Sequence, residues 1–321
     1  MLVRMRGSVF GIGTDVGGSV RIPALCNGIV GFKPSAGRVP AGGQETGQLP
    51  AARKVGLESQ VGVIARGWDD VDVLYAAMEG ARLWEVDQEI LPGNWWSEGV
   101  KTNSKAPANS KGKSITIGVI RRDGVTEPLP PIKRVLEEVV QKLRAHSITV
   151  LEVPGPRFKD CQTLTNKFFS AAGNTHLLSL LSHTSEPLIP WLAPRLKPKS
   201  PITLDTWRDL CAQRLQMQKD FLSYWKGPDG EDIDAIICPV APHPVPGIDK
   251  WNTMSYTASF VLLDYPAASL PVRNVSVEDL GEEMDGVDVL GPWDRINREL
   301  CEYSRGRIPC MKIVLMMIFR G

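Results

Sequence analysis

The sequence predicts a protein of the α/β class, because a strand, a helix and a second strand follow one another in the middle of the chain. Residues 115–120 and 148–153 are apolar runs of strand length. Between them, apolar residues recur at the spacing of one helical face, at Ile132, Val135, Leu136, Val139, Val140 and Leu143. A unit of this order places its two strands parallel in one sheet, with the helix packed against them.

A further helix followed by a strand repeats this theme. Thr203 or Asp205 can cap the helix, whose apolar positions are Trp207, Leu210, Cys211, Phe221, Leu222 and Trp225. Residues 234–240 then form a short apolar strand. The chain has no repeat at a fixed period and no heptad run, which excludes solenoids and coiled coils.

The first third of the chain is rich in glycine and predicts tight backbone turns. Nine glycines lie within residues 11–43, with almost no helical periodicity. The first helix is expected at Trp68, with an apolar stripe over 71–78 and Asp69 or Asp70 as N-cap. The polar stretch 97–114 predicts a flexible insertion at the surface.

Composition excludes several classes of protein. The 321 residues are 43% hydrophobic and 23% charged, which is typical of a globular protein with a buried core. The net charge of +1, without a basic stripe, gives no nucleic-acid footprint. No apolar run reaches the ~20 residues of a membrane span. The six scattered cysteines form no Cys-x-x-Cys pair and favour a reducing, cytoplasmic setting without metal or disulfide framework. The length is compatible with either one domain or two.

The segment that carries chemistry is residues 11–24, which read GIGTDVGGSVRIPA. Glycine allows positive φ and close approach to a ligand, and successive free N–H groups can form an anion-binding nest. A serine at the end of such a nest has its hydroxyl beside the donors that would hold a developing oxyanion. Ser19 is therefore a candidate nucleophile.

Two other interpretations of this segment exist. A dinucleotide-binding fingerprint requires a third glycine where Val16 stands, and Asp15 would place a carboxylate beside the pyrophosphate. Alternatively, the glycines belong to a structural turn and only permit close packing.

The segment resembles the hallmark of the amidase signature enzymes, Gly-x-Gly-x-Asp-x-Gly-Gly-Ser-x-Arg-x-Pro-Ala. A second family run appears as GFKPSAGRV at 31–39. Residues 62–66, 234–239 and 256–272 are also similar to family segments, so the resemblance extends to about residue 299. It is greatest to general, acetamidase-like members of the kind found in fungi.

The resemblance implies a mixed, mostly parallel central sheet covered by helices on both faces. Residues 1–300 would form a partial amidase signature domain, with 97–114 as its insertion, and 301–321 an atypical tail. The family's closing strand has no counterpart in the sequence. We therefore expect the apolar run 313–319 to lack a partner and the sheet to be incomplete.

The resemblance also implies hydrolysis of a small carboxamide through a serine acyl-enzyme, without a cofactor. Ser19 would be the nucleophile, and the oxyanion hole would be formed by the backbone N–H groups of Val16, Gly17, Gly18 and Ser19. Asp15 and Arg21 would form a buried pair that fixes the loop, supported by Thr14. Lys33 is not the base in this family, and His146, His176, His183 and His243 are interpreted as packing or surface residues.

The family's lysine base and cis-serine lie upstream of the motif, and residues 1–8 align with the stretch that follows the cis-serine. The sequence thus resembles an enzyme that lacks its N-terminal part. Two hypotheses result: an amide hydrolase whose base lies elsewhere, or a catalytically impaired fragment or pseudoenzyme. Neither the particular amide nor the oligomeric state, which includes a homodimer, is determined by the sequence.

Overall fold

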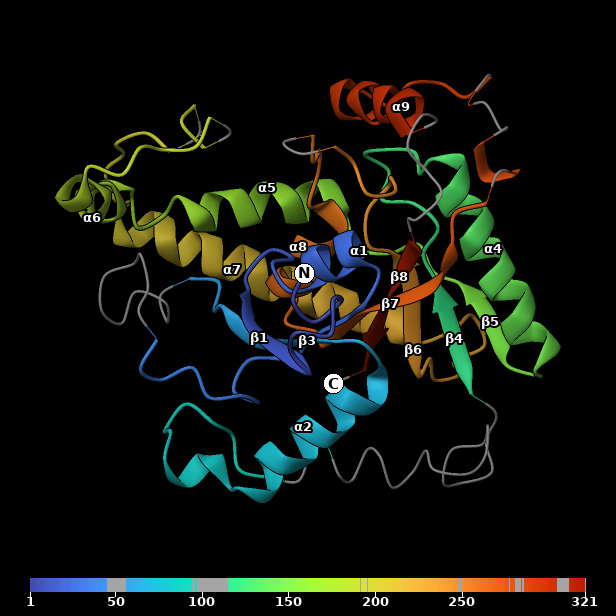
Figure 1. The fold of residues 1–321 in the computed structure, drawn as a ribbon, viewed down its shortest axis with the longest axis horizontal. Coiled ribbons are helices and arrows are strands. Elements are labelled where there is room, and N and C mark those ends of the chain that lie inside the picture. The colour runs from blue at the N-terminus through green and yellow to red at the C-terminus, as the bar shows by residue number, and fades with distance from the viewer. Residues whose placement is uncertain are drawn as a thin grey trace.

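The computed structural model contains an eight-stranded sheet flanked by helices (Figure 1). It describes residues 1–44, 56–93, 96, 115–190, 192–194, 196–247, 250–276, 278–280, 284, 286–304 and 312–320, without the side chains of 280 and 301–304. The strand order is β1-β3-β2-β7-β8-β6-β4-β5. The strands are β1 (Phe10–Asp15), β2 (Val30–Lys33), β3 (Gln60–Ala65), β4 (Thr116–Val119), β5 (Thr149–Glu152), β6 (Ala235–Pro239), β7 (Ala267–Asn274) and β8 (Lys312–Phe319).

Helices lie on both faces of this sheet. Those of the described residues are α1 (Arg21–Asn27), α2 (Trp68–Gly80), α4 (Pro130–Ala145), α5 (Phe158–Phe169), α6 (Thr175–Thr184), α7 (Leu204–Phe221), α8 (Ser255–Leu262) and α9 (Pro292–Ser304). Short 3-10 turns occur at Leu83–Glu85, Leu222–Trp225 and Glu278–Leu280. In the part of the chain that the structure describes, no helix combines the length and apolar character needed to cross a bilayer.

The predicted strand–helix–strand unit is confirmed as β4, α4 and β5. The two strands pair in parallel, with Ile117 opposite Val150, and β6 adds a second parallel pair to β4. The helix predicted behind Thr203 is α7, and Thr203 is its N-cap, with its side chain accepting a hydrogen bond of 3.2 Å from the N–H of Thr206. The α/β class is therefore confirmed.

The expectation of a mostly parallel sheet is wrong. Among the described residues, the five pairs that join β1, β3, β2, β7, β8 and β6 are antiparallel, and the two pairs around β4 are parallel. A parallel pair requires a crossover connection such as α4, and the sequence shows that periodicity clearly only around 115–153. The mostly parallel sheet that the resemblance implied therefore overestimated the parallel content of the described strands.

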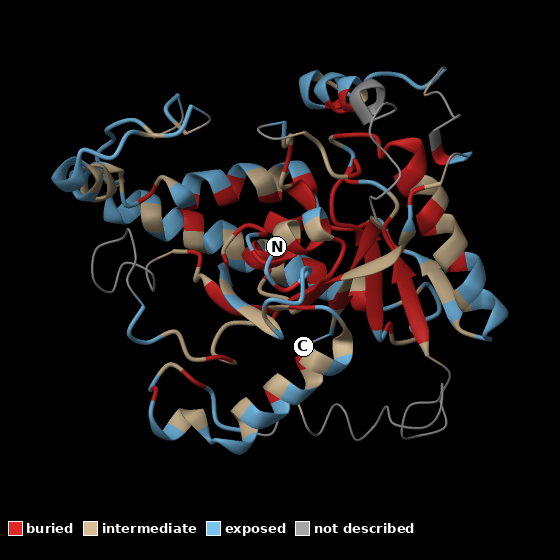
Figure 2. Ribbon diagram, in the orientation of Figure 1, coloured by how far each residue is buried: buried red, intermediate tan, exposed pale blue. Residues whose placement is uncertain are grey.

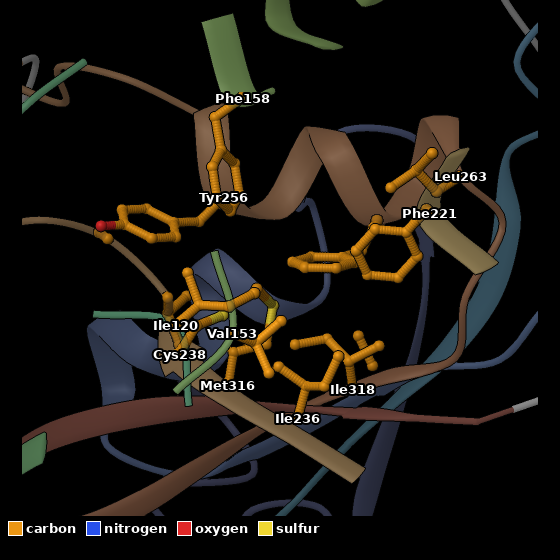
Figure 3. Close-up of a cluster of buried hydrophobic side chains, with 14 of the residues drawn as sticks. Ile120, Val153, Phe158, Phe221, Ile236, Cys238, Tyr256, Leu263, Met316 and Ile318 are labelled. Carbon is orange, nitrogen blue, oxygen red and sulfur yellow. The ribbon is translucent and has the colours of Figure 1, made fainter. Parts of the chain in front are cut away.

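The central strands β6 and β8 are buried on both faces (Figure 2). Ile236, Met316 and Ile318 belong to an apolar cluster with Phe221 and Tyr256, from α7 and α8. Figure 3 shows these aromatic and aliphatic side chains above the strands. Their neighbours in sequence point the opposite way, toward α4, because successive side chains of a strand alternate between faces. This second cluster contains Ile132, Val135, Leu136, Val140, Ala235, Ile237, Ile313 and Leu315.

The prediction that residues 313–319 lack a partner is also wrong. These residues form most of β8, which lies between β7 and β6, with Leu270 and Pro239 both opposite Leu315. The run differs from the family's closing sequence, but its continuous apolar character suits a strand that is covered on both faces. The atypical sequence of the tail thus contributes a central strand of the sheet.

The glycine-rich first third contains more regular structure than the turns predicted from its sequence. It contributes β1, β2 and the seven-residue helix α1. Gly11, Gly13 and Gly31 lie within strands, where Gly31 has no room for a side chain: a Cβ there would lie 2.6 Å from the Cβ of Ala24. Close packing of α1 on β2 accounts for glycine at this position.

Two further predictions concern local boundaries. The helix expected at Trp68 is α2, but its N-cap is Gly67 rather than Asp69 or Asp70. Asp70 instead occupies the third helical position and accepts a hydrogen bond of 3.4 Å from the N–H of Gly67. The predicted flexible insertion, 97–114, lies outside the described residues.

Candidate active site

The candidate nucleophile Ser19 lies in the short turn between β1 and α1. The strand ends at Asp15, where it pairs with Gln60 of β3, and the helix begins at Arg21. The side chain of Ser19 is exposed, whereas Asp15 and Arg21 on either side of the turn are fully buried. Within the described residues, Ser19 Oγ makes no hydrogen bond, so the hydroxyl is open to a ligand.

Asp15 and Arg21 form a bidentate ion pair beneath the turn. Arg21 Nε donates to Asp15 Oδ2 at 2.9 Å, and Nη2 donates to Oδ1 at 3.0 Å. Burial by itself would raise the pKa of Asp15, but the guanidinium of Arg21 and the hydrogen bonds hold this pKa below its usual value. The carboxylate is therefore ionised at neutral pH, as the predicted loop-fixing pair requires.

The same carboxylate also holds the backbone of the turn. Asp15 Oδ1 accepts a hydrogen bond of 2.6 Å from the N–H of Gly18, and Oδ2 accepts one of 3.3 Å from Val20. The N–H of Gly18, predicted as part of the oxyanion hole, is therefore already engaged. Among the described residues, the N–H groups of Val16, Gly17 and Ser19 have no acceptor. Three of the four N–H groups predicted for the oxyanion hole are therefore unpaired within the part of the chain that the structure describes.

The two glycines before Ser19 leave little room for a side chain, and at Gly18 the backbone conformation itself requires glycine. Gly18 has φ of +129°, a conformation that side chains rarely adopt. A Cβ at Gly18 would also lie 2.5 Å from Thr257 Oγ1. At Gly17 a Cβ would lie 3.3 Å from the ring of Phe169, at the end of α5. The turn is thus confined between α1, α5 and α8.

Helix α8 contacts the turn through Thr257, which is fully buried. Thr257 Oγ1 donates to the carbonyl oxygen of Gly17 at 2.7 Å. The backbone carbonyl of Thr257 accepts a hydrogen bond of 2.9 Å from Arg21 Nη2. More than 230 residues separate these partners in sequence. Thr257 lies in the family-like segment 256–272, but nothing in that segment connects it with the turn, so its contact with Gly17 could not be predicted.

The sequence of this chain matches the family description Amidase over residues 1–285. The chain belongs to the amidase family. This match includes the turn with Ser19, the pair Asp15 and Arg21, and helix α8.

Curated fungal amidases are similar to this chain. It is 31% identical over 275 residues to an acetamidase of Aspergillus oryzae and 29% identical over 283 residues to an acetamidase of Emericella nidulans. Each alignment covers 84% of this chain and 49% of the relative. The chain thus spans about half the length of the curated amidases that it matches.

Solved structures share the fold. A fatty acid amide hydrolase superposes with a TM-score of 0.82 at 24% identity, over 99% of this chain and 54% of that protein. A 6-aminohexanoate cyclic dimer hydrolase superposes with a TM-score of 0.66 at 18% identity, over 99% of this chain and 62% of that protein. At these identities the likeness establishes the fold alone.

Thr14 and Lys33 are two further residues near the turn around Ser19, and neither forms, among the described residues, an ion pair like that of Asp15 and Arg21. Thr14, predicted as a supporting residue, has an exposed side chain that makes no hydrogen bond within the described residues. Lys33 of β2 is fully buried, and its Nζ donates to the carbonyl of Pro34 at 2.8 Å. Burial, together with the charge of Arg21, lowers the pKa of Lys33 to about 8.

The histidines occupy separate environments in the structure. His146 ends α4 and His183 lies in the last turn of α6, both exposed. His243 is buried against the Trp251 ring, with Nδ1 donating to the Pro244 carbonyl at 2.8 Å, and burial lowers its pKa to about 4. The described residues contain no group of three or more His, Cys, Asp or Glu side chains that could hold a metal ion.

Proposed function

We propose that this amidase hydrolyses the carbon–nitrogen bond of a small carboxamide through an acyl-enzyme on Ser19. The observation that supports this most directly is the exposed hydroxyl of Ser19 at the end of a turn that carries backbone N–H groups without an acceptor. Such a juxtaposition is what nucleophilic attack on a carbonyl requires.

In the proposed reaction, Ser19 Oγ attacks the carbonyl carbon and its proton passes to a base. The carbonyl oxygen becomes an oxyanion, which the N–H groups of Val16, Gly17 and Ser19 would stabilise. The C–N bond then breaks, and the nitrogen leaves with a proton as ammonia or an amine. Water attacks the resulting ester, releasing the carboxylate and restoring the hydroxyl. Asp15 and Arg21 hold the turn and transfer no proton.

The impaired alternative rests on two observations. No side chain of the described residues donates to or accepts from Ser19 Oγ, and the chain spans about half of its curated relatives. The resemblance places the lysine base and cis-serine upstream of the motif. Because a positioned base typically contributes 10²- to 10⁴-fold, we propose that the 321 residues alone turn over amides very slowly.

The relatives suggest where to begin with substrates. Two of the most similar curated relatives are named acetamidases, so short aliphatic amides are the first class to test. The cysteines that the structure describes, Cys26, Cys161, Cys211 and Cys238, are free thiols. Because this use of cysteine is typical of a reducing compartment, we propose a cytoplasmic enzyme.

The decisive experiment is labelling by a fluorophosphonate probe, with the modified residue located by mass spectrometry. We expect a single adduct on Ser19 that is lost in Ser19→Ala and retained in Ser182→Ala, which removes an exposed serine of α6. A folded chain that forms no adduct, even at high probe concentration, would contradict an acyl-enzyme on Ser19 in this chain and leave only the impaired alternative.

Ammonia release from acetamide separates the two candidates. Turnover by the 321-residue chain that disappears in Ser19→Ala would exclude the impaired alternative. Labelling of Ser19 without measurable turnover would support it.

A further inference from the structure

The peptide group between Gly17 and Gly18 is held at both of its polar ends. Its carbonyl oxygen accepts the hydrogen bond of 2.7 Å from Thr257 Oγ1. Its N–H, carried by Gly18, donates to Asp15 Oδ1 at 2.6 Å. Both partner side chains are fully buried, so water does not compete for either bond.

This peptide group is the one in the turn that is easiest to rotate, because it lies between two glycines. Glycine has no Cβ to restrict φ and ψ, and the freedom that lets this turn approach a ligand also lets its peptide planes turn. The N–H groups of Gly17 and Ser19 belong to the two neighbouring peptide planes, and their directions change when φ and ψ at Gly17 and Gly18 are free to vary. The geometry of the oxyanion hole therefore depends on bonds made from outside the turn.

We propose that Thr257 is a positioning residue of the amidase reaction, which orients the oxyanion hole by fixing the Gly17–Gly18 peptide plane. This inference rests on the proposed function of Ser19. Asp15 fixes the N–H end of the plane, and Thr257 fixes the carbonyl end. A substrate oxyanion then meets N–H groups that are already directed toward it, which is the condition for electrostatic stabilisation without reorganisation.

The hydroxyl of Thr257 has two acceptors within reach. A helical threonine commonly bonds a carbonyl three or four residues earlier, and Met254 O lies 3.3 Å from Thr257 Oγ1. The carbonyl of Gly17 is closer, at 2.7 Å. The single hydroxyl proton therefore goes to the turn rather than to the helix.

The backbone of the same residue strengthens the connection. The Thr257 carbonyl accepts from Arg21 Nη2, and Arg21 binds Asp15, which in turn binds Gly18. Together with the bond from Thr257 to Gly17, these contacts close a ring of hydrogen bonds around the peptide plane. Removing the hydroxyl opens this ring at the carbonyl of Gly17 and leaves the other contacts in place.

The variants that test the proposal are Thr257→Val, which keeps the shape but removes the hydroxyl, and Thr257→Ser, which restores it. The matched control is Ser259→Ala. Ser259 is also fully buried on α8, and its hydroxyl donates to Ser255 O at 2.6 Å, so this variant removes a buried hydroxyl without touching the turn. All four proteins are compared as the full 321-residue chain.

The first measurement is the second-order rate of fluorophosphonate labelling at Ser19, because the phosphoryl oxygen occupies the oxyanion position. We expect Thr257→Val to slow labelling about 10-fold or more, toward the 10²- to 10³-fold loss typical of removing an oxyanion donor. Thr257→Ser and Ser259→Ala should label at close to the unmodified rate. Equal rates in Thr257→Val and the unmodified chain would overturn the proposal.

The second measurement does not depend on reactivity. Hydrogen exchange of the Gly18 amide, followed by NMR, reports directly on the peptide plane. We expect exchange about 10-fold faster in Thr257→Val and unchanged in Thr257→Ser and Ser259→Ala. Unchanged Gly18 exchange in Thr257→Val would overturn the proposal even if Ser19 proved unreactive. A mobile plane without Ser19 labelling would instead contradict the proposed function alone.

Discussion

The residues beneath the turn around Ser19 and those of the central strands β6 and β8 are both buried, but different interactions hold the two regions. Beneath the turn, an ion pair and hydrogen bonds with defined directions join Asp15, Arg21 and Thr257. Around the strands, apolar side chains pack against α4 on one face and α8 on the other. Directional bonds fix the orientation of individual atoms, whereas apolar packing fixes the positions of whole elements. In the candidate site, directional bonds orient the turn, and apolar packing positions the strands and helices that carry it.

The variant with the largest expected effect is Arg21→Met, which removes the ion pair beneath the turn. It leaves Asp15 as a buried charge without its counter-ion, which typically costs 3–5 kcal/mol. We expect a fall of about this size in the free energy of unfolding, measured with urea, together with loss of Ser19 labelling in the protein that remains folded.

The control for this change is Arg320→Met. Arg320 pairs with Asp232 at the surface, at 2.6 Å, with both side chains about two-fifths exposed. Exposed ion pairs contribute little to stability, so the free energy of unfolding of this variant should be close to that of the unmodified chain. An equal fall in the free energy of unfolding in the two variants would show that the buried pair stabilises the chain no more than the surface pair does.

The apolar region is tested by Ile318→Ala in β8. Ile318 is fully buried beside Phe221 and Ile236 in the cluster of Figure 3. Truncation of a buried isoleucine costs about 2–5 kcal/mol, so we expect a loss in that range by urea unfolding. In contrast to Arg21→Met, the folded fraction should label at Ser19 at the unmodified rate.

The matched control is Ile296→Ala, in a side chain of α9 that is 44% exposed. It should change the free energy of unfolding by no more than about 0.5 kcal/mol. If Ile318→Ala were as mild as this control, β8 would not occupy the centre of the sheet.

The same comparison explains what the sequence could predict. Apolar periodicity is local, so β4, α4, β5, β6 and α7 follow from patterns within short windows. The motif around Ser19 is also local, and its resemblance to the amidase signature implied the pairing of Asp15 with Arg21. Thr257 reaches the turn only through the tertiary fold, and no spacing could have identified it. Likewise, the neighbours of β8 depend on strand order, which the apolar run 313–319 does not specify.

The smallest effect concerns the pH dependence of Lys33, a third buried charge in this part of the molecule. Its folded-state pKa, about 8, lies below the usual 10.5, chiefly because of burial. Between these values the unfolded chain binds more protons than the folded one, so this group makes the protein more stable as pH rises. Since one pH unit corresponds to at most about 1.4 kcal/mol for one proton, we expect a gain of about 1 kcal/mol from pH 8 to pH 9.

Other buried groups titrate nearby, so the measurement is a difference between the unmodified chain and Lys33→Met. Burial raises the pKa of the Cys161 thiol to about 11 and raises that of Cys238 further, which removes stability as pH rises past about 9 in both proteins. Subtracting the two unfolding curves cancels this common loss. A difference that stays flat from pH 8 to pH 9 would mean that Lys33 keeps its proton in the folded chain. Its ammonium would then be stabilised by the nearby carboxylates, Asp264 and Asp15, strongly enough to offset its burial.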